Sequence, residues 1–472
     1  MQTLGHASLG LITTIAAPAL ACATALDNGA AKAAVVRRPD IVLMLVDDMS
    51  WRDTPLHGAP DIRTPNMERI AAAGMTFNRA FVASPTSAPS RGALLTAMNP
   101  VRNGALFNHQ SPRPGVKRWP AYFKELGYEV VAIGKVAHYA QVTGYGFDYV
   151  SHYKYHQDDC VEHAINWLAA RKSDKPLCLI VGTNWPHVPW PDASAATLDP
   201  SRVALPPMLL DTPEMRVAWT RYAAAVANAD RDAGLVYDAA RKHLGEGVFF
   251  AFTSDNGAQF PFHKWTCYDG GLRTPLVAVW PGRVAAGSRA DAMVGWIDLM
   301  PTLLEVAGGS PPRTGLGAGE IDGASFLATL RDARTPHRDA VFATHSGDGR
   351  MNEYPMRAVR TERWKYIRNL SPENEFHTHI DRVVKDEGYW PSWVGKARAD
   401  ANAQQVVARY FNRPAEELYD IESDPHELRN LADDPACAQT LRDMRRKLDD
   451  WMASQGDQGL ETERKMKPVA KR

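Results

Sequence analysis

The chain has 472 residues, of which 45% are hydrophobic and 23% are charged, an ordinary balance for a folded globular protein that can build a large core. Its 54 basic and 54 acidic residues give a formal net charge of +0, so no global field points to nucleic acid or a membrane surface as a partner. Any recognition of an anion must therefore be local.

The N-terminal segment is typical of an export signal. Residues 9–21 form an apolar run with small residues toward its end, too short to span a membrane. No Lys or Arg precedes this run, which departs from the usual pattern. We predict a signal peptide over residues 1–25, no membrane span, and a periplasmic or extracellular location.

Strand-like and helical segments alternate as far as residue 306, which predicts an α/β fold. The strand-like segments are short apolar runs, as expected for strands buried on both faces of a parallel sheet. The helical segments carry start and stop signals such as Thr-Pro before them and Gly after them. Strands are predicted over residues 40–46, 77–83, 129–133, 177–181, 248–253 and 276–280, and helices over 67–73, 122–126, 161–171, 214–244 and 297–306.

Oxygen-bearing side chains follow two of these strands. One apolar run ends in Asp47 and Asp48, and another, residues 248–253, is followed by Asp255 and Asn256. Ligands of open α/β sheets collect beyond the carboxyl ends of the strands. Carboxylate and amide oxygens favour Ca²⁺, with Mg²⁺ as the alternative. Each pair taken alone is also explained as a loop cap or a turn.

A hydroxyl side chain stands where a helix is predicted to begin. Pro89 suits the first helical turn, so Ser87 lies at or near the N-cap. The free N–H groups of a helix start favour a bound anion or a developing negative charge. Arg91 lies one turn further along the same face and can reach back as a fixed cation. Taken alone, the segment is better explained as an ordinary Ser-Pro helix cap.

Basic side chains follow further predicted strands. Lys135 and His138 come after the strand that ends at residue 133, and His187 stands between two prolines after the next strand. Imidazole suits a general acid near neutral pH, so His187 is a candidate for protonating a leaving group. Lys264 belongs to a Gly-rich segment further on. The alternatives are a solvated lysine and a histidine held between prolines for structural reasons.

These motifs together resemble those of the sulfatases, a family of the alkaline phosphatase superfamily. The signature in its Ser form is Ser87-x-Pro89-Ser90-Arg91, and the resemblance extends from about residue 38 to about residue 434. The other matching segments are Gly134-Lys135-x-x-His138, Pro186-His187-x-Pro189, Asp255-Asn256, and Lys264 followed by Tyr268-x-Gly270-Gly271-x-Arg273-x-Pro275.

The resemblance implies the architecture. We expect an alkaline-phosphatase-like α/β/α sandwich with a large mixed sheet, forming a catalytic domain over residues 38–335. A smaller C-terminal α+β subdomain with an antiparallel sheet would cover residues 336–472. The stretch 369–413 is either a loop that lines the pocket or a folded surface insertion. Segments that look like strands of the smaller sheet are 357–360, 364–368 and 417–420.

The resemblance also implies the chemistry. A maturation enzyme would oxidise Ser87 to formylglycine, whose hydrate attacks sulfur, while His187 protonates the leaving atom. Lys135 and Lys264 would contact the sulfate group, and His138 the formylglycine oxygen. The catalytic set implied is Ser87, Arg91, Lys135, His138, His187 and Lys264, and the Ca²⁺ ligands implied are Asp47, Asp48, Ser87, Asp255 and Asn256.

The expected function is hydrolysis of sulfate esters or N-sulfamates of a sulfated saccharide. Residues 256–264 and 364–370 look like the glucosamine N-sulfatase branch, whereas the spacing from Lys135 to His138 looks like the iduronate sulfatase branch. A heparan-type amino sugar or uronic acid is therefore favoured. Two alternatives stay open: a phosphate or phosphonate ester hydrolase of the same superfamily, and an inactive glycan-binding protein.

Overall fold

The protein is represented by a computed structural model that describes residues 37–192, 198–348, 351, 353–383 and 388–468. The segment from Arg38 to the C-terminus forms one compact unit. The predicted signal peptide lies outside the described residues. Among the described helices, none combines the length and the hydropathy that a membrane crossing requires. The predicted domain boundary at residue 335 stays a prediction.

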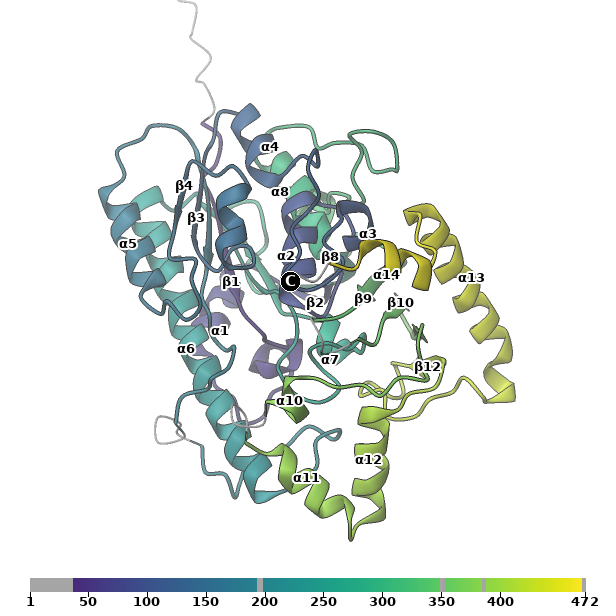
Figure 1. Cartoon of the computed structure of the whole chain (residues 1–472). Coiled ribbons are helices and arrows are strands. Elements are labelled where there is room, and N and C mark those ends of the chain that lie inside the picture. Colours follow the sequence, from purple (N-terminus) through teal and green to yellow (C-terminus); the bar gives the residue numbers. More distant parts are fainter. Residues whose placement is uncertain (1–36, 193–197, 349–350, 352, 384–387, 469–472) are drawn as a thin grey trace, which may run out of the picture. The chain divides into compact units, whose positions relative to one another are not determined.

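The larger sheet is mixed, as predicted, and it has eight strands (Figure 1). Their order is β4-β3-β5-β1-β6-β7-β2-β8, and among the described pairings of this sheet only those of β7 are antiparallel. The carboxyl ends of β3, β5, β1 and β6 therefore meet at one edge. The strands are β1 (Ile41–Val46), β2 (Met75–Phe81), β3 (Glu129–Gly134), β4 (Tyr149–Ser151), β5 (Leu177–Gly182), β6 (Phe249–Ser254), β7 (Leu276–Val279) and β8 (Ser288–Gly295).

Helices cover both faces of this sheet, which explains why every residue of β1, β5 and β6 is buried. α6 packs against both α1 and α5, and α8 packs against both α2 and α4 (Figure 1). The predicted helix over 214–244 is α6. The helices are α1 (Pro65–Ala72), α2 (Ser87–Thr96), α3 (Pro100–Asn103), α4 (Trp119–Glu125), α5 (Cys160–Ala170), α6 (Pro213–Leu244), α7 (Asp269–Leu272), α8 (Leu299–Val306) and α9 (Leu327–Arg331).

The predicted strand over 77–83 is shifted, because β2 ends at Phe81. Val82 donates its backbone N–H to the carbonyl oxygen of Leu272, which lies outside the sheet strands, so the chain leaves the sheet there. The short segment that follows leads into α2, whose first residue is Ser87. The four cysteines of the described chain, Cys160, Cys178, Cys267 and Cys437, are free thiols.

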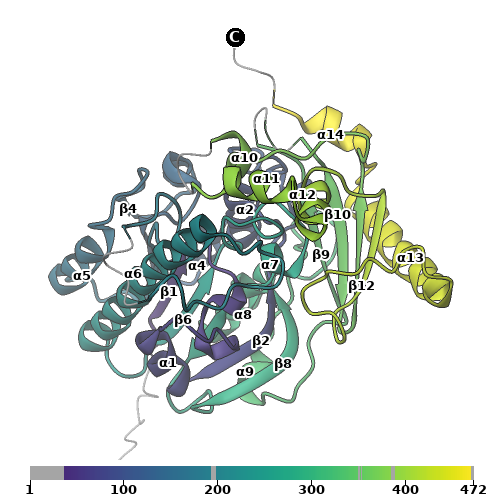
Figure 2. The same cartoon turned by 90° about the horizontal axis from the view of Figure 1, so that it is seen from below.

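A second sheet of four antiparallel strands has the order β12-β11-β10-β9, and α13 packs on β10 and β11 (Figure 2). The antiparallel sheet predicted for the C-terminal part is therefore present. The described part of the stretch 369–413 contains three helices. The elements are β9 (Ala340–His345), β10 (Met356–Thr361), β11 (Trp364–Asn369), β12 (Glu416–Asp420), α10 (His379–Arg382), α11 (Trp390–Ala397), α12 (Ala401–Phe411), α13 (Ala438–Gln455) and α14 (Leu460–Met466).

A buried ion pair fastens the C-terminal helices to the second sheet. Arg357 of β10 is fully buried, and its guanidinium donates to Asp457 Oδ2 at 2.5 Å and to Glu463 Oε1 at 2.7 Å. Asp457 follows α13, and Glu463 lies in α14. Because a guanidinium stays charged, both carboxylates are needed to offset its removal from water.

We predict that Asp457→Ala lowers the free energy of unfolding by about 3 kcal/mol, the lower end of the range for breaking a buried pair, because Glu463 remains as a partner. Denaturant unfolding measures this loss. The matched control is Glu461→Ala in α14, which removes an exposed partner of Lys465. The control should cost at most about 1 kcal/mol. Equal losses in the two variants would contradict the role assigned to Arg357.

Candidate active site

Three carboxylates gather at the carboxyl ends of two adjacent strands. Asp47 and Asp48 follow β1, Asp255 follows β6, and the last residues of these strands, Val46 and Ser254, lie opposite each other. One oxygen from each of the three carboxylates lies within 4.8 Å of the other two, and all three side chains are buried. Asp48 has a φ of 67°, which breaks the strand alternation that would send neighbouring side chains to opposite faces.

Arg91 ties two of these acids together. Its Nε donates to Asp255 Oδ2 at 2.8 Å and its Nη2 to Asp47 Oδ1 at 3.2 Å, and its Nη1 donates to the carbonyl oxygen of Lys135. Burial raises the pKa of Asp255, and the charge of Arg91 opposes this rise. The sequence indicated that Arg91 can reach back as a fixed cation. In the structure it pairs with the carboxylates, because a fully buried guanidinium requires anionic partners.

Two lysines pair with the remaining carboxylate oxygens. Lys135 Nζ lies 2.5 Å from Asp47 Oδ2, and Lys264 Nζ lies 2.6 Å from Asp48 Oδ2. Both lysine side chains are at most 5% exposed. Together with Arg91 they supply three positive charges against three negative ones. The buried cluster therefore carries no net charge, which lowers the free-energy cost of removing its groups from water.

Ser87 is the first residue of α2 and faces this cluster. Its Oγ lies 3.4 Å from Asp47 Oδ1 and 3.4 Å from Asn256 Oδ1. The amide nitrogen of Asn256 donates to Asp48 Oδ1 at 2.7 Å, which turns its oxygen toward Ser87. The oxygens at these positions are the hard donors that Ca²⁺ or Mg²⁺ prefer, so the residues present fit a divalent cation of that class.

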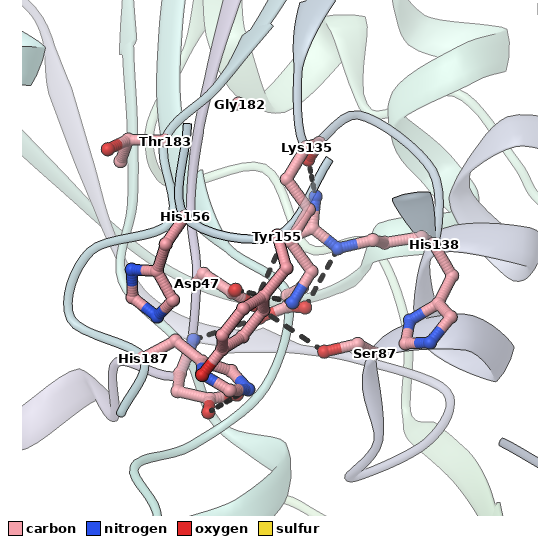
Figure 3. Close-up of polar contacts among 12 residues, drawn as sticks. Asp47, Ser87, Lys135, His138, Tyr155, His156, Gly182, Thr183 and His187 are labelled. Carbon is pink, nitrogen blue, oxygen red and sulfur yellow. Dashed lines mark hydrogen bonds and ion pairs between the residues drawn. The ribbon is translucent and has the colours of Figure 1, made fainter. Parts of the chain in front are cut away.

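Two histidines lie beside Lys135 and Ser87 (Figure 3). His187 donates from Nδ1 to the carbonyl oxygen of Val188 at 2.6 Å, and its Nε2 lies 3.6 Å from Asp48 Oδ2. Burial, followed by the charges of Lys264 and Lys135, lowers the pKa of His187 well below its usual value. Burial and the charge of Lys135 do the same to the pKa of His138. Both imidazoles are therefore neutral at pH 7 in this structure.

Lys264 is delivered by a tightly wound segment. Trp265 donates its N–H to the carbonyl oxygen of Pro85 at 2.9 Å, which holds the segment against the approach to Ser87. A Cβ on Gly271 would lie 2.3 Å from the carbonyl oxygen of His263, too close for any other residue. The Gly-Gly pair of the motif thus permits the winding that places Lys264 in the cluster.

A cavity of about 220 Å³ opens onto these groups. Five of the six predicted catalytic residues line it, and Arg91 lies behind it. The sequence carried no motif for Asn108, His109 or Asp348, and only the undecided stretch 369–413 hinted at His379. The lining residues are Ser87, Asn108, His109, Lys135, His138, Tyr139, Tyr155, His187, Val188, Gln259, Lys264, Trp265, Asp348 and His379.

Comparison with known proteins identifies the family. The model of the sulfatase family matches residues 39–310, more than half of the chain. The chain belongs to the sulfatase family. It is accordingly a sulfuric ester hydrolase, and the family and enzyme class predicted from the motifs are confirmed. A second model, described as the C-terminal part of N-sulphoglucosamine sulphohydrolase, matches residues 257–386 of this sulfatase.

Curated relatives cover most of this sulfatase. An ulvan-active sulfatase of Formosa agariphila is 27% identical over 434 residues, which are 90% of this chain and 82% of the relative. Human N-sulphoglucosamine sulphohydrolase is 27% identical over 477 residues, 91% of this chain and 92% of the relative. Among solved structures, a protein in complex with its substrate D-glucosamine-2-N,6-O-disulfate has a TM-score of 0.67 at 20% identity, covering 89% of this chain and 99% of that one. The last similarity confirms the fold.

Proposed function

We propose that this sulfatase removes sulfate from a sulfated saccharide, and that a heparan-type amino sugar is the favoured substrate. The observation that carries this proposal is which part of the chain supplies the cavity wall. Five lining residues lie within the range matched by the N-sulphoglucosamine sulphohydrolase model, namely Gln259, Lys264, Trp265, Asp348 and His379. The volume of about 220 Å³ is below the usual range of ligand pockets, which favours recognition of one sugar residue.

The sugar ring would pack against an aromatic surface. The rings of Trp265 and His379 are stacked with centroids 5.1 Å apart and an angle of 15° between their planes. Aromatic faces with a few convergent polar groups are usual in ligand pockets. Lys264 Nζ lies 4.9 Å from the centroid of the Trp265 ring, so the aromatic surface adjoins the ammonium group that would meet the sulfate.

The buried cluster would bind the sulfate group. Asp47, Asp48, residue 87, Asp255 and Asn256 would hold Ca²⁺, with Mg²⁺ as the alternative, and the cation would supply positive charge to the sulfate oxygens. A cation bound among the carboxylates would also offset the negative charges that pair with the two lysines in the structure. Their ammonium groups can then donate to the anion, where positive charge lowers the barrier of sulfate transfer.

Residue 87 would act as formylglycine, whose hydrate offers one hydroxyl as nucleophile and a second hydroxyl that allows sulfate to leave by elimination. His187 would hold a proton on Nε2 and give it to the departing oxygen or nitrogen. The imidazole of His187 is neutral in the structure, because burial and the charges of Lys264 and Lys135 lower its pKa. The negative charge of the bound sulfate group therefore has to offset these lysines before His187 can act as an acid.

Three kinds of substrate separate this function from its rivals. Fully converted protein should desulfate N- or O-sulfated glucosamine faster than sulfated uronic acid, and faster than phosphate mono- and diesters. A preference for phosphoesters would support the phosphate or phosphonate hydrolase. Binding of sulfated saccharides with no turnover of any ester would support the glycan-binding alternative. Export of the protein to the periplasm or outside the cell is proposed from the N-terminal sequence.

The cation prediction concerns Asp48. Adding Ca²⁺ to metal-stripped protein should raise the free energy of unfolding by about 2.7 kcal/mol at a hundred times the dissociation constant. Asp48→Asn should abolish most of this shift, because one hard carboxylate ligand is lost. Thermal unfolding with and without Ca²⁺ measures it. Asp230→Asn, a buried acid that accepts from Met67 outside the cluster, should keep the shift. Stoichiometric zinc in the purified protein would refute the assignment.

The leaving-group prediction concerns His187. General acid catalysis contributes roughly 10²- to 10⁴-fold, and its contribution grows as the leaving group becomes more basic. His187→Ala should therefore slow the hydrolysis of sugar sulfates far more than that of nitrophenyl sulfate. Steady-state rates on both substrates measure the difference. If both rates fall by the same factor, His187 serves binding or structure.

The maturation prediction concerns Ser87. Protein made in a host without the maturation enzyme should be folded, should respond to Ca²⁺, and should be nearly inactive. Co-expression with a maturation enzyme that accepts Ser should restore activity. Peptide mass analysis of the segment from Ser87 to Arg91 should then show the loss of two hydrogens. Full turnover of sulfate esters with an intact serine would overturn this mechanism and favour the phosphoester hydrolase.

A further inference from the structure

A series of hydrogen-bonded side chains connects Asp348, which follows the first strand of the second sheet, to His138. Asp348 Oδ1 lies 2.9 Å from His109 Nε2, and His109 Nδ1 lies 2.7 Å from His138 Nε2. The two imidazole rings meet edge to face with centroids 4.5 Å apart. The second oxygen of Asp348 accepts from Asn108 Nδ2 at 3.0 Å. The carboxylate is therefore held at both oxygens, with its side chain 9% exposed.

This series allows one arrangement of protons when both imidazoles are neutral. An ionised carboxylate only accepts hydrogen bonds, so His109 carries its proton on Nε2 and accepts with Nδ1. His138 must then carry its proton on Nε2, which leaves its Nδ1 as an acceptor. Burial opposes the ionisation of Asp348, but hydrogen bonds from His109 and Asn108 hold its pKa at about 2. The carboxylate is consequently ionised at neutral pH.

The acceptor nitrogen of His138 is not used by the described part of the protein. His138 is 7% exposed, and its Nδ1 is buried without a hydrogen-bond partner among the described residues. Buried polar atoms are nearly always paired, so an exception calls for a function. His138 and Ser87 line the same cavity. A free imidazole nitrogen in that position is suited to take a proton from a reacting group.

The series is also fastened to the start of α2. Asn108 Oδ1 accepts from the backbone N–H of Ala88, the residue after Ser87, at 3.2 Å. The side-chain amide of Gln141 donates to the carbonyl oxygen of His109 at 2.8 Å. His109 itself has a φ of 66°, an unfavourable backbone conformation that persists only where its surroundings enforce it. The position of His109 relative to Ser87 is thus set by contacts on both sides.

We propose that Asp348 and His109 are positioning residues that fix the tautomer of His138, so that its Nδ1 accepts a proton from residue 87 in the step that releases sulfate. This inference rests on the proposed function. In that step a proton passes from the remaining hydroxyl of residue 87 to Nδ1. A carbon–oxygen double bond forms as the bond from that carbon to the sulfate oxygen breaks, and the electron pair leaves with sulfate.

The tautomer can be measured without any turnover. ¹⁵N NMR of histidine-labelled protein in its Ser87 form, with the His138 signals assigned by their loss in His138→Gln, distinguishes a protonated Nε2 from a protonated Nδ1. We expect the proton on Nε2 in the wild type and a mixture of tautomers in Asp348→Ala. The matched control is Asp159→Ala, which removes the carboxylate 3.2 Å from His152 Nε2. It should leave His138 unchanged. A proton on Nδ1 in the wild type would overturn the proposal.

The kinetic test uses converted protein and nitrophenyl sulfate. Asp348→Ala should lower kcat by about 10-fold, a part of what a general base contributes, and should lower KM with it, so that kcat/KM changes by less than about 2-fold. A burst of about one nitrophenol per active site should appear, because sulfate release has become the slow step. His109→Gln, which keeps a donor for Asp348 and an acceptor for His138, should retain more kcat than His109→Phe.

Two outcomes separate this inference from the proposed function. A raised KM with unchanged kcat would assign Asp348 and His109 to substrate binding and overturn the inference, while leaving the sulfatase mechanism intact. Wild-type protein that carries formylglycine and shows the expected tautomer, but turns over only phosphoesters, would refute the proposed function. In that case Asp348 and His109 would still fix the tautomer of His138, but the assignment of this tautomer to sulfate release would be refuted.

Discussion

The structure of the site depends on the burial of three carboxylates at the ends of β1 and β6. Carboxylates removed from water are stable only next to positive charge, and Arg91 satisfies this need by reaching Asp47 and Asp255 at once. Since Arg91 belongs to α2, its pairing also fixes the helix that carries Ser87. The position of Ser87 is therefore set by the same ion pairs that stabilise the buried carboxylates.

Much of this arrangement could be read from the sequence, because the strands that carry it are buried on both faces. β1, β5 and β6 are continuous apolar runs, and the polar residues that end them are conspicuous. β8 escaped prediction because it lies at the edge of the sheet and has mixed burial, so its polar and apolar residues give no continuous run. The motif glycines were also a clear signal in the sequence. The structure gives their physical reason, because Gly271 has no room for a Cβ.

The residues that sequence could not supply come from distant segments brought together by the fold. Asn108 and Asp348 are 240 positions apart. Their hydrogen bond depends on the docking of the second sheet against the segment before α2, where Thr344 donates its N–H to the carbonyl oxygen of Ala83. Neither residue lies at the end of a buried strand of the larger sheet, which is where ligand sites of open α/β sheets are usually found. His379 opens a short helix in a stretch whose composition fitted a surface insertion equally well. Its stacking on Trp265 is a tertiary contact without a local pattern.

The two histidines of the site differ in tautomer rather than in charge. Both are neutral for the same reason, burial next to lysines. His187 donates from Nδ1 to the carbonyl oxygen of Val188 and turns Nε2 toward Asp48. In the tautomer that we propose, His138 donates from Nε2 to His109, and its Nδ1 has no hydrogen-bond partner among the described residues. One neutral imidazole thus presents Nε2 and the other Nδ1. Besides burial, Lys264 and Lys135 both lower the pKa of His187, whereas Lys135 is the lysine that lowers the pKa of His138. Under the proposed function, the anionic substrate offsets these charges, which would raise the proton affinity of His187 and let it serve as the acid. In the same proposal His138, which an ionised carboxylate holds through His109, serves as the base.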